Sequence, residues 1–115
     1  MKALICGDRN WTDKTLIRKV VESLPEITLI IQGCARGADN LAEEVGEELS
    51  IPVLGFPADW GRYGRGAGMI RNREMLDEKP DIVLAFHNHF PSSKGTKDCV
   101  KEAQRRGIET RIFRS

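Results

Sequence analysis

Short apolar runs alternate along the chain with stretches in which apolar residues recur every three or four positions. The runs predict β-strands over Ala3–Cys6, Thr28–Ile31, Val53–Phe56, Asp81–Phe86 and Glu109–Phe113. The stretches between them predict helices over Leu16–Leu24, Leu41–Leu49, Ile70–Glu78 and Thr96–Arg106, with a weaker apolar pattern in Ile70–Glu78. Thr12 or Asp13 is the expected N-cap of the first helix, because either side chain can accept a backbone hydrogen bond there.

The order of these elements predicts the fold. Strands separated by helices of this length are typical of βαβ units with right-handed crossovers. The runs Leu29–Ile31 and Ile82–Phe86 are almost wholly apolar, as expected for parallel strands covered on both faces. The sequence therefore predicts an α/β, Rossmann-like three-layer sandwich with a five-stranded parallel sheet in the order 3-2-1-4-5. We expect one domain over residues 1–115.

Composition narrows the class of protein. Hydrophobic residues make up 40% of the 115 residues and charged residues 30%, which is a globular balance. The 18 Lys and Arg nearly cancel the 17 Asp and Glu, so the chain lacks the strongly basic charge of many nucleic-acid binding proteins. No apolar run approaches the roughly 20 residues that cross a bilayer, and polar Gly7–Arg9 follows too early for a secretory signal. We expect a cytoplasmic protein that does not bind membranes.

Cysteine and histidine give little sign of a metal site. Cys6, Cys34 and Cys99 are odd in number and form no C-x-x-C pair, so neither a disulfide framework nor a zinc site is indicated. His87 and His89 form an H-x-H pair just after a predicted strand, but no third ligand is evident in the sequence. We therefore expect no metal and no cofactor.

Candidate ligand-binding residues follow the predicted strands. In a parallel sheet, ligands bind at the carboxyl ends of the strands, near the point where the strand order reverses. The segments at those positions are rich in glycine and arginine: Gly7–Trp11, Gly33–Asp39, Asp59–Arg73 and His87–Asp98. Two of them open a helix, where free N–H groups and glycine allow a phosphate to approach. None matches G-x-G-x-x-G or the P-loop pattern, so a standard dinucleotide or P-loop site is not predicted.

Five motifs in these segments resemble the SLOG superfamily. They are Gly7-Asp8-Arg9 followed by Trp11, Gly33-x-Ala35-Arg36-Gly37-Ala38-Asp39, Pro57-Ala58-Asp59-Trp60, Gly66-Ala67-Gly68-x-x-Arg71-Asn72-x-x-Met75, and Lys94-Gly95-Thr96-x-Asp98. The nearest branch is the small YspA-like one, domain of unknown function 2493. The resemblance covers nearly the whole chain and implies a Rossmann-like fold that binds or processes nucleotides or nucleotide-derived ligands. It also implies a distant relation to LOG phosphoribohydrolases and to the DNA-processing protein DprA.

The chain departs from the LOG enzymes at their catalytic loop. Those enzymes carry a PGGxGTxxE loop with a catalytic glutamate, and an arginine upstream. Here Ser92 and Ser93 replace the glycine pair, and Cys99 falls at the glutamate position. N-glycosidic cleavage needs a carboxyl group, and Asp98 is the only one near this position. The resemblance thus makes Arg71 and Asp98 the candidate catalytic residues and leaves open whether the ligand is turned over.

The remaining site residues are predicted to bind the ligand. The N-terminus of the last helix, at Lys94-Gly95-Thr96, is expected to hold a phosphate together with Arg71. Asp39 is expected to bind a ribose hydroxyl or to stabilise a helix N-terminus, and Trp60 to stack on a base or to contact a second subunit. The predicted ligand-binding set is Gly7, Arg9, Gly33, Arg36, Gly37, Asp39, Trp60, Arg71, Asn72, Lys94, Gly95 and Thr96.

The sequence favours one function over two alternatives. We predict a protein that binds a nucleotide-like small molecule, and the resemblance implies a homodimer paired through the helices that flank the ligand edge. The first alternative is a phosphoribohydrolase-type enzyme that acts on nucleoside monophosphates. The second is a DprA-like binder of single-stranded DNA, which the balanced charge disfavours because DNA affinity depends on basic contacts to phosphates.

Overall fold

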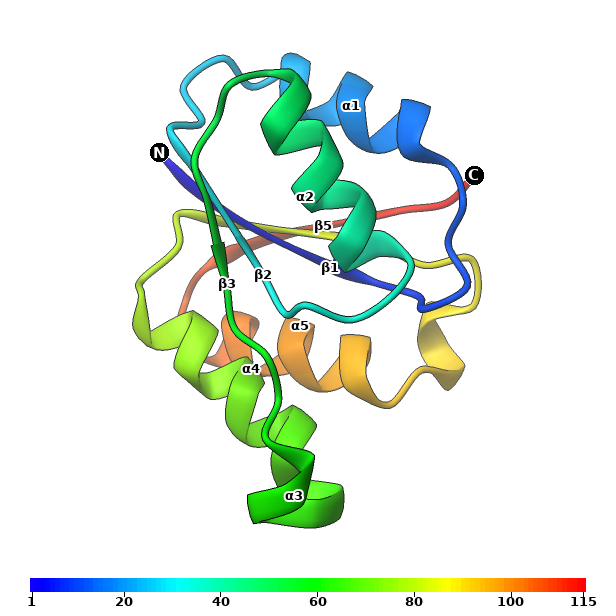
Figure 1. The fold of residues 1–115 in the computed structure, drawn as a ribbon, viewed down its shortest axis with the longest axis vertical. Helices are drawn as coiled ribbons and strands as arrows, with labels where there is room; N and C mark the ends of the chain where they lie inside the picture. The colour runs from blue at the N-terminus through cyan, green and yellow to red at the C-terminus, as the bar shows by residue number, and fades with distance from the viewer.

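The computed structural model describes residues 1–115 and contains one five-stranded parallel sheet (Figure 1). The strands are β1 Lys2–Gly7, β2 Leu29–Gln32, β3 Val53–Gly55, β4 Ile82–Phe86 and β5 Glu109–Phe113. They lie side by side in the order β3-β2-β1-β4-β5, and every neighbouring pair is parallel. This order confirms the predicted Rossmann-like α/β fold.

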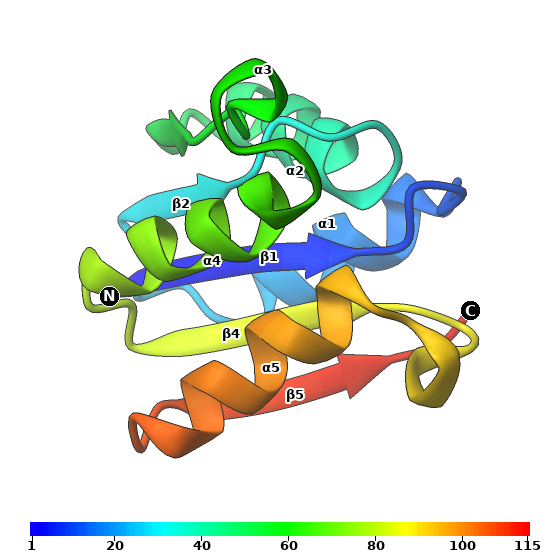
Figure 2. The same ribbon diagram turned by 90° about the horizontal axis from the view of Figure 1, so that it is seen from below.

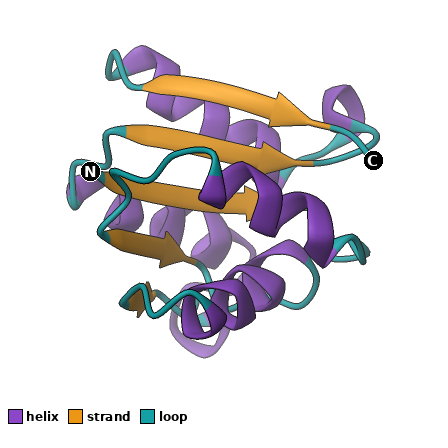
Figure 3. Cartoon of the chain, turned by 90° about the horizontal axis from the view of Figure 1, so that it is seen from above, coloured by secondary structure: helices purple, strands orange, loops and turns teal.

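Helices cover both faces of the sheet. They are α1 Lys14–Glu22, α2 Ala38–Glu48, α3 Trp60–Tyr63, α4 Ala67–Asp77 and α5 Gly95–Arg105, with short 3₁₀ turns η1 Gly64–Gly66 and η2 Phe90–Ser92. Figure 2 shows α4 and α5 across one face, whereas α1 and α2 lie on the opposite face in Figure 3. None of these helices has the length and apolarity needed to cross a membrane.

The long helices were predicted correctly, but the glycine-rich stretch before α4 was not. No helix was predicted between Phe56 and Ile70, and the structure places α3 and η1 there. The reason is local, because the carboxylate of Asp59 accepts a hydrogen bond from the backbone N–H of Arg62 at 3.1 Å and so caps a short helix. Helix α4 begins at Ala67, three residues earlier than expected, directly after η1.

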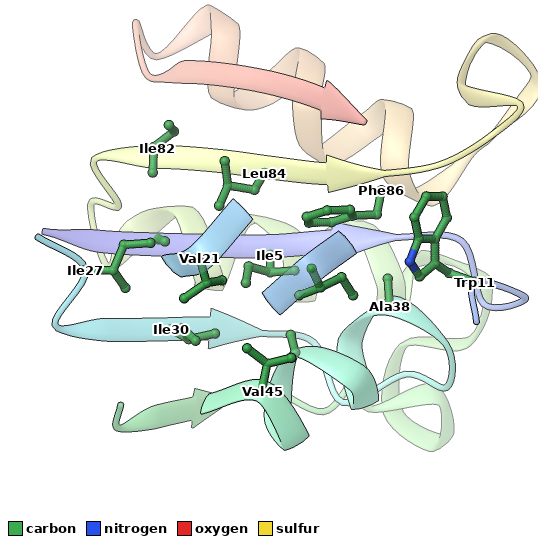
Figure 4. Close-up of a cluster of buried hydrophobic side chains, with 13 residues drawn as sticks. Ile5, Trp11, Val21, Ile27, Ile30, Ala38, Val45, Ile82, Leu84 and Phe86 are labelled. Carbon is green, nitrogen blue, oxygen red and sulfur yellow. The ribbon is translucent and has the colours of Figure 1, made fainter. Parts of the chain in front are cut away.

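Two apolar layers hold the sheet between the helices. Alternate residues of β1 point to opposite faces, so that Ile5 packs toward α1 and α2 and Leu4 packs toward α4 and α5. Figure 4 shows the first layer, in which the ring of Trp11 lies edge-on to that of Phe86 at 5.7 Å between centroids. Residues of β1 and β4 belong to both layers, so these two strands are packed on both faces. The packing fixes the positions of the residues at their ends.

The strand order reverses between β1 and β4. The crossover from β1 to β2 runs through α1 on one face, and the crossover from β4 to β5 runs through α5 on the other (Figure 2). The backbone N–H of Asp8 bonds to the carbonyl of Phe86 at 2.9 Å, so the pairing continues one residue past β1. This is the position at which doubly wound folds bind their ligands.

Candidate functional site

A cavity of about 390 Å³ lies at the edge of the sheet where the central strands end. Its walls come from the loops after β1, β2 and β4, from α3, and from the first turns of α2, α4 and α5. The predicted ligand-binding residues that line it are Gly7, Arg9, Asp39, Trp60, Arg71, Asn72, Lys94, Gly95 and Thr96. The fold therefore brings most of the predicted set together, from segments that are far apart in the sequence.

The cavity is more basic than the chain as a whole. Its basic side chains are Arg9, Arg65, Arg71 and Lys94, whereas its carboxyl groups belong only to Asp8 and Asp39. The complete chain has a net charge of only +1. Positive charge is thus concentrated where the helices begin, which favours an anionic ligand.

Helix α5 begins at the cavity with one side-chain acceptor in its first turn, Oγ of Ser93, which accepts the N–H of Lys97 at 3.1 Å. Lys94 occupies the N-cap position and makes no capping hydrogen bond, so the N–H groups of Gly95 and Thr96 have no acceptor within the helix. The side chain of Thr96 lines the cavity, is only 7% exposed, and makes no hydrogen bond through its hydroxyl. A Cβ at Gly95 would have no neighbouring protein atom within 4 Å. The start of α5 thus offers unused donors beside open space.

Arg71 is held across the cavity by its neighbours. One guanidinium nitrogen donates to the carbonyl of Gly33, and Nε donates to Oδ1 of Asn72 at 3.1 Å. A Cβ at Gly33 would lie 2.5 Å from Nη1 of Arg71 and 2.9 Å from Oδ2 of Asp39. Gly33 therefore contributes by making room for Arg71 rather than by lining the cavity.

Asp98 belongs to a network between α4 and α5. Its carboxylate accepts hydrogen bonds from Nδ2 of Asn72 at 3.0 Å and from Nη1 of Arg73 at 3.1 Å, and its side chain is 15% exposed. The same Nδ2 donates to the carbonyl of Gly95 at 3.1 Å. Asp98 does not line the cavity. Its contacts join the two helices and position the start of α5.

Asp39 is the buried carboxyl group of the cavity. It lies in the first turn of α2, is 7% exposed, and accepts a hydrogen bond from the N–H of Ala35 at 3.3 Å. Burial raises the pKa of Asp39 to about 6, although the N–H groups of Ala35 and Gly33 and the charges of Arg71 and Arg9 act in the opposite direction. This carboxyl group therefore exchanges its proton close to neutral pH.

Trp60 forms the aromatic rim of the cavity. Its side chain is half exposed, and the guanidinium carbon of Arg9 lies 5.8 Å from the centre of its ring. On the helix side, a Cβ at Gly68 would lie 3.4 Å from the ring, so the indole rests against the start of α4. The cap of α3 orders this segment, which gives the ring a defined place beside the ligand space.

Four predicted residues lie outside the lining: Gly33, Arg36, Gly37 and Asp98. Arg36 is exposed on the loop before α2. Gly37 has a φ of +76°, and a Cβ there would lie 2.3 Å from the carbonyl oxygen of Asp8. Gly37 thus allows the loop after β1 to pack against the start of α2.

Comparison with known proteins identifies the family. The model of the YspA, cpYpsA-related SLOG family matches residues 1–63. The chain is also 34% identical over 116 residues to the Gene 61 protein of Mycobacterium phage D29, a match that covers 93% of this chain and 91% of that protein. The chain belongs to the YspA, cpYpsA-related SLOG family.

A solved structure with the same fold is the DNA processing protein A (DprA) of Streptococcus pneumoniae. The two structures superpose with a TM-score of 0.79 at 15% sequence identity, over 96% of this chain and 49% of the DprA chain. This SLOG family member thus spans about half of DprA. At this identity the likeness concerns the fold.

Sequence reasoning did not assign several residues that line the cavity of this SLOG protein. Cys6 and Cys99 form part of its floor, and the interaction of the Cys6 thiol as donor with Cys99, together with burial, raises the pKa of the Cys6 thiol. Asp8 and His87 lie beside each other, with 3.8 Å between Oδ2 and Nε2. The available signal for this pair was their place directly after the two central strands. No group of three or more His, Cys, Asp or Glu is arranged to hold a metal ion.

Proposed function

We propose that the cavity binds a nucleotide or nucleotide-derived small molecule whose phosphate lies at the N-terminus of α5. The observation that carries this proposal is that Thr96 lines the cavity and is only 7% exposed, while its hydroxyl makes no hydrogen bond within the chain. The N–H groups of Gly95 and Thr96, which have no acceptor within the chain, lie at the same helix start. Membership of the SLOG family and the DprA-like fold support a nucleotide-related ligand.

Each part of the cavity has a role in this proposal. The N–H groups of Gly95 and Thr96 donate to the phosphate, while Lys94 and Arg71 neutralise its charge. The exposed ring of Trp60 stacks on the base. A volume of about 390 Å³ is within the range of small-molecule pockets and suits a mononucleotide better than an oligonucleotide.

The test compares nucleoside 5′-monophosphates with the matching nucleosides by calorimetry. Gly95→Val should weaken binding of the monophosphates about tenfold to a hundredfold and change nucleoside binding much less, because its side chain occupies the phosphate space. Gly66→Val is the matched control, since Gly66 also has no protein atom within 4 Å of a Cβ and does not line the cavity.

Three results would contradict the proposal. The first is the absence of binding or of thermal stabilisation by any mononucleotide at millimolar concentration. The second is an equal loss of monophosphate and nucleoside binding in Gly95→Val with the fold intact. The third is tight, steeply salt-dependent binding of single-stranded DNA oligomers without binding of mononucleotides, which would favour the DNA-binding alternative.

The environment of Asp39 favours a second function. This function is hydrolysis of the N-glycosidic bond of a nucleoside monophosphate, which gives free base and ribose 5-phosphate. The carboxyl group of Asp39 is buried in the cavity near Arg71 and has a pKa of about 6. Asp98, in contrast, is bonded to Asn72 and Arg73. We therefore propose Asp39 as the acid or base of such a reaction, with Asp98 positioning α5.

Release of free base from nucleoside monophosphates tests this second function. Asp39→Asn should abolish the release, whereas Asp98→Asn should reduce it only as far as it disturbs the start of α5. The Asp98 variant then serves as the matched carboxyl-to-amide control. Activity that survives in Asp39→Asn and disappears in Asp98→Asn would instead assign the reaction to Asp98.

We also propose that the chain forms a homodimer through the helices beside the cavity. Trp60, Tyr63 and Met69 are large apolar side chains with exposed fractions of 50%, 41% and 51%, and all lie on α3 or the first turn of α4. Apolar side chains exposed together favour contact with a partner. Light scattering should give twice the mass of the chain at micromolar concentration, and a monomer there would contradict this proposal.

A further inference from the structure

Asp8 and His87 are the first residues after the two central strands, at the point where the strand order reverses. Gly7 pairs with Phe86, and the N–H of Asp8 continues the ladder by donating to the carbonyl of Phe86 at 2.9 Å. The N–H of His87 donates to the carbonyl of Phe113 at 3.0 Å. Because both backbones are fixed by the sheet, the two side chains start from rigid positions, and both line the cavity.

One polar atom of each side chain is occupied by its own loop. Oδ1 of Asp8 accepts the backbone N–H of Asn10 at 2.9 Å, and Nδ1 of His87 accepts the backbone N–H of His89 at 2.9 Å. An imidazole nitrogen that accepts carries no hydrogen, so the neutral ring of His87 bears its hydrogen on Nε2. The orientation and the tautomer of the pair are therefore set before any ligand arrives.

The other polar atom of each side chain remains available. Oδ2 of Asp8 and Nε2 of His87 are 3.8 Å apart, which is longer than a hydrogen bond, and neither atom has another hydrogen-bond partner. The side chains of His87 and Asp8 are 12% and 25% exposed, so the pair is partly withdrawn from solvent. The result is one acceptor and one donor side by side in a cavity wall.

We propose that this pair binds the vicinal hydroxyls of a ribose and so selects ribonucleotides over deoxyribonucleotides. One hydroxyl donates to Oδ2 of Asp8, and the neighbouring hydroxyl accepts from Nε2–H of His87. Vicinal hydroxyls offer a donor and an acceptor on adjacent atoms, which matches the pair. The inference rests on the proposed function, since it assumes that a nucleotide occupies the cavity.

The pair shares the cavity with the proposed sites for base and phosphate, and its residues adjoin the segments that carry them. Asp8 precedes Arg9, whose guanidinium lies over Trp60 at the rim. His87 opens the segment that leads to Lys94 and α5. In a nucleotide the ribose connects the base to the phosphate, so the ribose is the part expected here. Oδ2 of Asp39, the other carboxyl oxygen considered for this role, already accepts the N–H of Ala35.

The test compares ribonucleotides with their deoxy counterparts on the full chain. The probes are the common nucleoside 5′-monophosphates in ribo, 2′-deoxy and 3′-deoxy forms, with calorimetric affinities. Each hydroxyl of the ribose forms one hydrogen bond with the Asp8–His87 pair. The ribo form of the bound nucleotide should therefore bind about tenfold more tightly than either deoxy form.

Variants of the pair should remove this preference without removing nucleotide binding. In Asp8→Asn the carbonyl oxygen keeps the bond to Asn10, so an NH₂ group replaces the acceptor and only ribonucleotide affinity should fall. His87→Ala should act similarly, whereas His87→Gln restores an N–H donor near the Nε2 position and should recover part of the preference. His89→Ala is the matched control, because the side chain of His89 does not line the cavity.

The outcomes separate this inference from the proposed function. Equal affinity for ribo and deoxy forms, with the dependence on phosphate and on Gly95 retained, overturns the role of the pair and leaves the phosphate site standing. An equal loss of both forms in Asp8→Asn, with unchanged thermal unfolding, assigns the pair a structural role and also overturns the inference. Loss of the ribose preference in Asp39→Asn but not in Asp8→Asn places the hydroxyls elsewhere. No binding of any nucleotide refutes the proposed function itself.

Discussion

Helices α1 and α5 begin at the same edge of the sheet but in opposite ways. At the start of α1, the carboxylate of Asp13 accepts the N–H of Leu16 at 3.0 Å, so the helix supplies its own cap. At the start of α5, the N-cap residue Lys94 supplies a positive charge and no capping hydrogen bond. Oγ of Ser93 accepts only the N–H of Lys97, and the hydroxyl of Thr96 is left without a partner. The first arrangement stabilises the fold, whereas the second leaves donors free for an anion.

Helix α2 represents a third arrangement. Its acidic residue, Asp39, also accepts a backbone N–H near the helix start, but it does so while buried in the wall of the cavity. The burial raises the pKa of Asp39 to about 6. The three helix starts thus divide between an end capped by its N-cap carboxylate, a buried acidic end and a basic end whose N-cap residue makes no capping bond, and only the last two face the cavity.

The largest effect is expected from the buried acidic end. The pKa of Asp39 is higher in the folded protein, about 6, than its ordinary value of 3.8, so this group favours folding below pH 3.8 and loses that contribution as the pH rises through 6. The free energy of unfolding should therefore fall by about 3 kcal/mol over this range, at roughly 1.4 kcal/mol per pKa unit.

Chemical denaturation between pH 4 and pH 7.5 measures this effect. Asp39→Asn cannot ionise, so its stability should lack this fall with rising pH, and the difference between the two proteins should follow one proton near pH 6. Asp98→Asn is the control, because it changes a carboxyl group outside the cavity. Parallel stability curves for the natural protein and Asp39→Asn would contradict the assignment.

The next effect is expected from placing a carboxylate at the N-cap position of α5. Lys94→Asp places at the start of α5 the residue type that caps α1, and it replaces a positive charge in the cavity with a negative one. Affinity for nucleoside monophosphates should fall tenfold to a hundredfold, about 1.5–3 kcal/mol. The protein without ligand should become more stable by about 1 kcal/mol, as measured by denaturation. Unchanged monophosphate affinity would exclude α5 as the phosphate site.

The smallest effect is expected from removing the existing cap. Asp13→Ala leaves the N–H of Leu16 without its acceptor and should lower the free energy of unfolding by about 1 kcal/mol. Its affinity for nucleotides should match that of the natural protein, because Asp13 does not line the cavity. A loss of affinity comparable to that of Lys94→Asp would mean that the two helix starts do not differ in function.

Residue spacing and helix-capping preferences were sufficient to predict most of the helices and strands. A cap at Thr12 or Asp13, the central strands and the strand order were predicted from residue spacing and from the usual arrangement of βαβ crossovers, and the structure places the cap at Asp13. The same rules placed Lys94, Thr96 and Arg71 at one edge, since the ends of parallel strands and the starts of the following helices meet there. The Asp59 cap that forms α3 was present in the sequence but was not used.

The sequence could not show which carboxyl group lines the cavity. Asp98 and Asp39 each lie near the start of a helix, and no pattern shows which one faces the ligand space. The choice depends on how α4 packs against α5, because Asn72 and Arg73 bind Asp98 and keep it out of the cavity lining. Such contacts join residues about 25 positions apart and have no periodic signature.

By itself, the sequence determined the α/β architecture and the edge at which the ligand-binding residues gather, because hydrophobic periodicity and crossover handedness leave few alternatives. Tertiary structure alone decided which polar atoms remain unpartnered at that edge. It left the hydroxyl of Thr96 without a hydrogen-bond partner and buried the carboxyl group of Asp39. It also set Oδ2 of Asp8 3.8 Å from Nε2 of His87. These features depend on burial and on contacts between distant segments, which form only when the layers pack together.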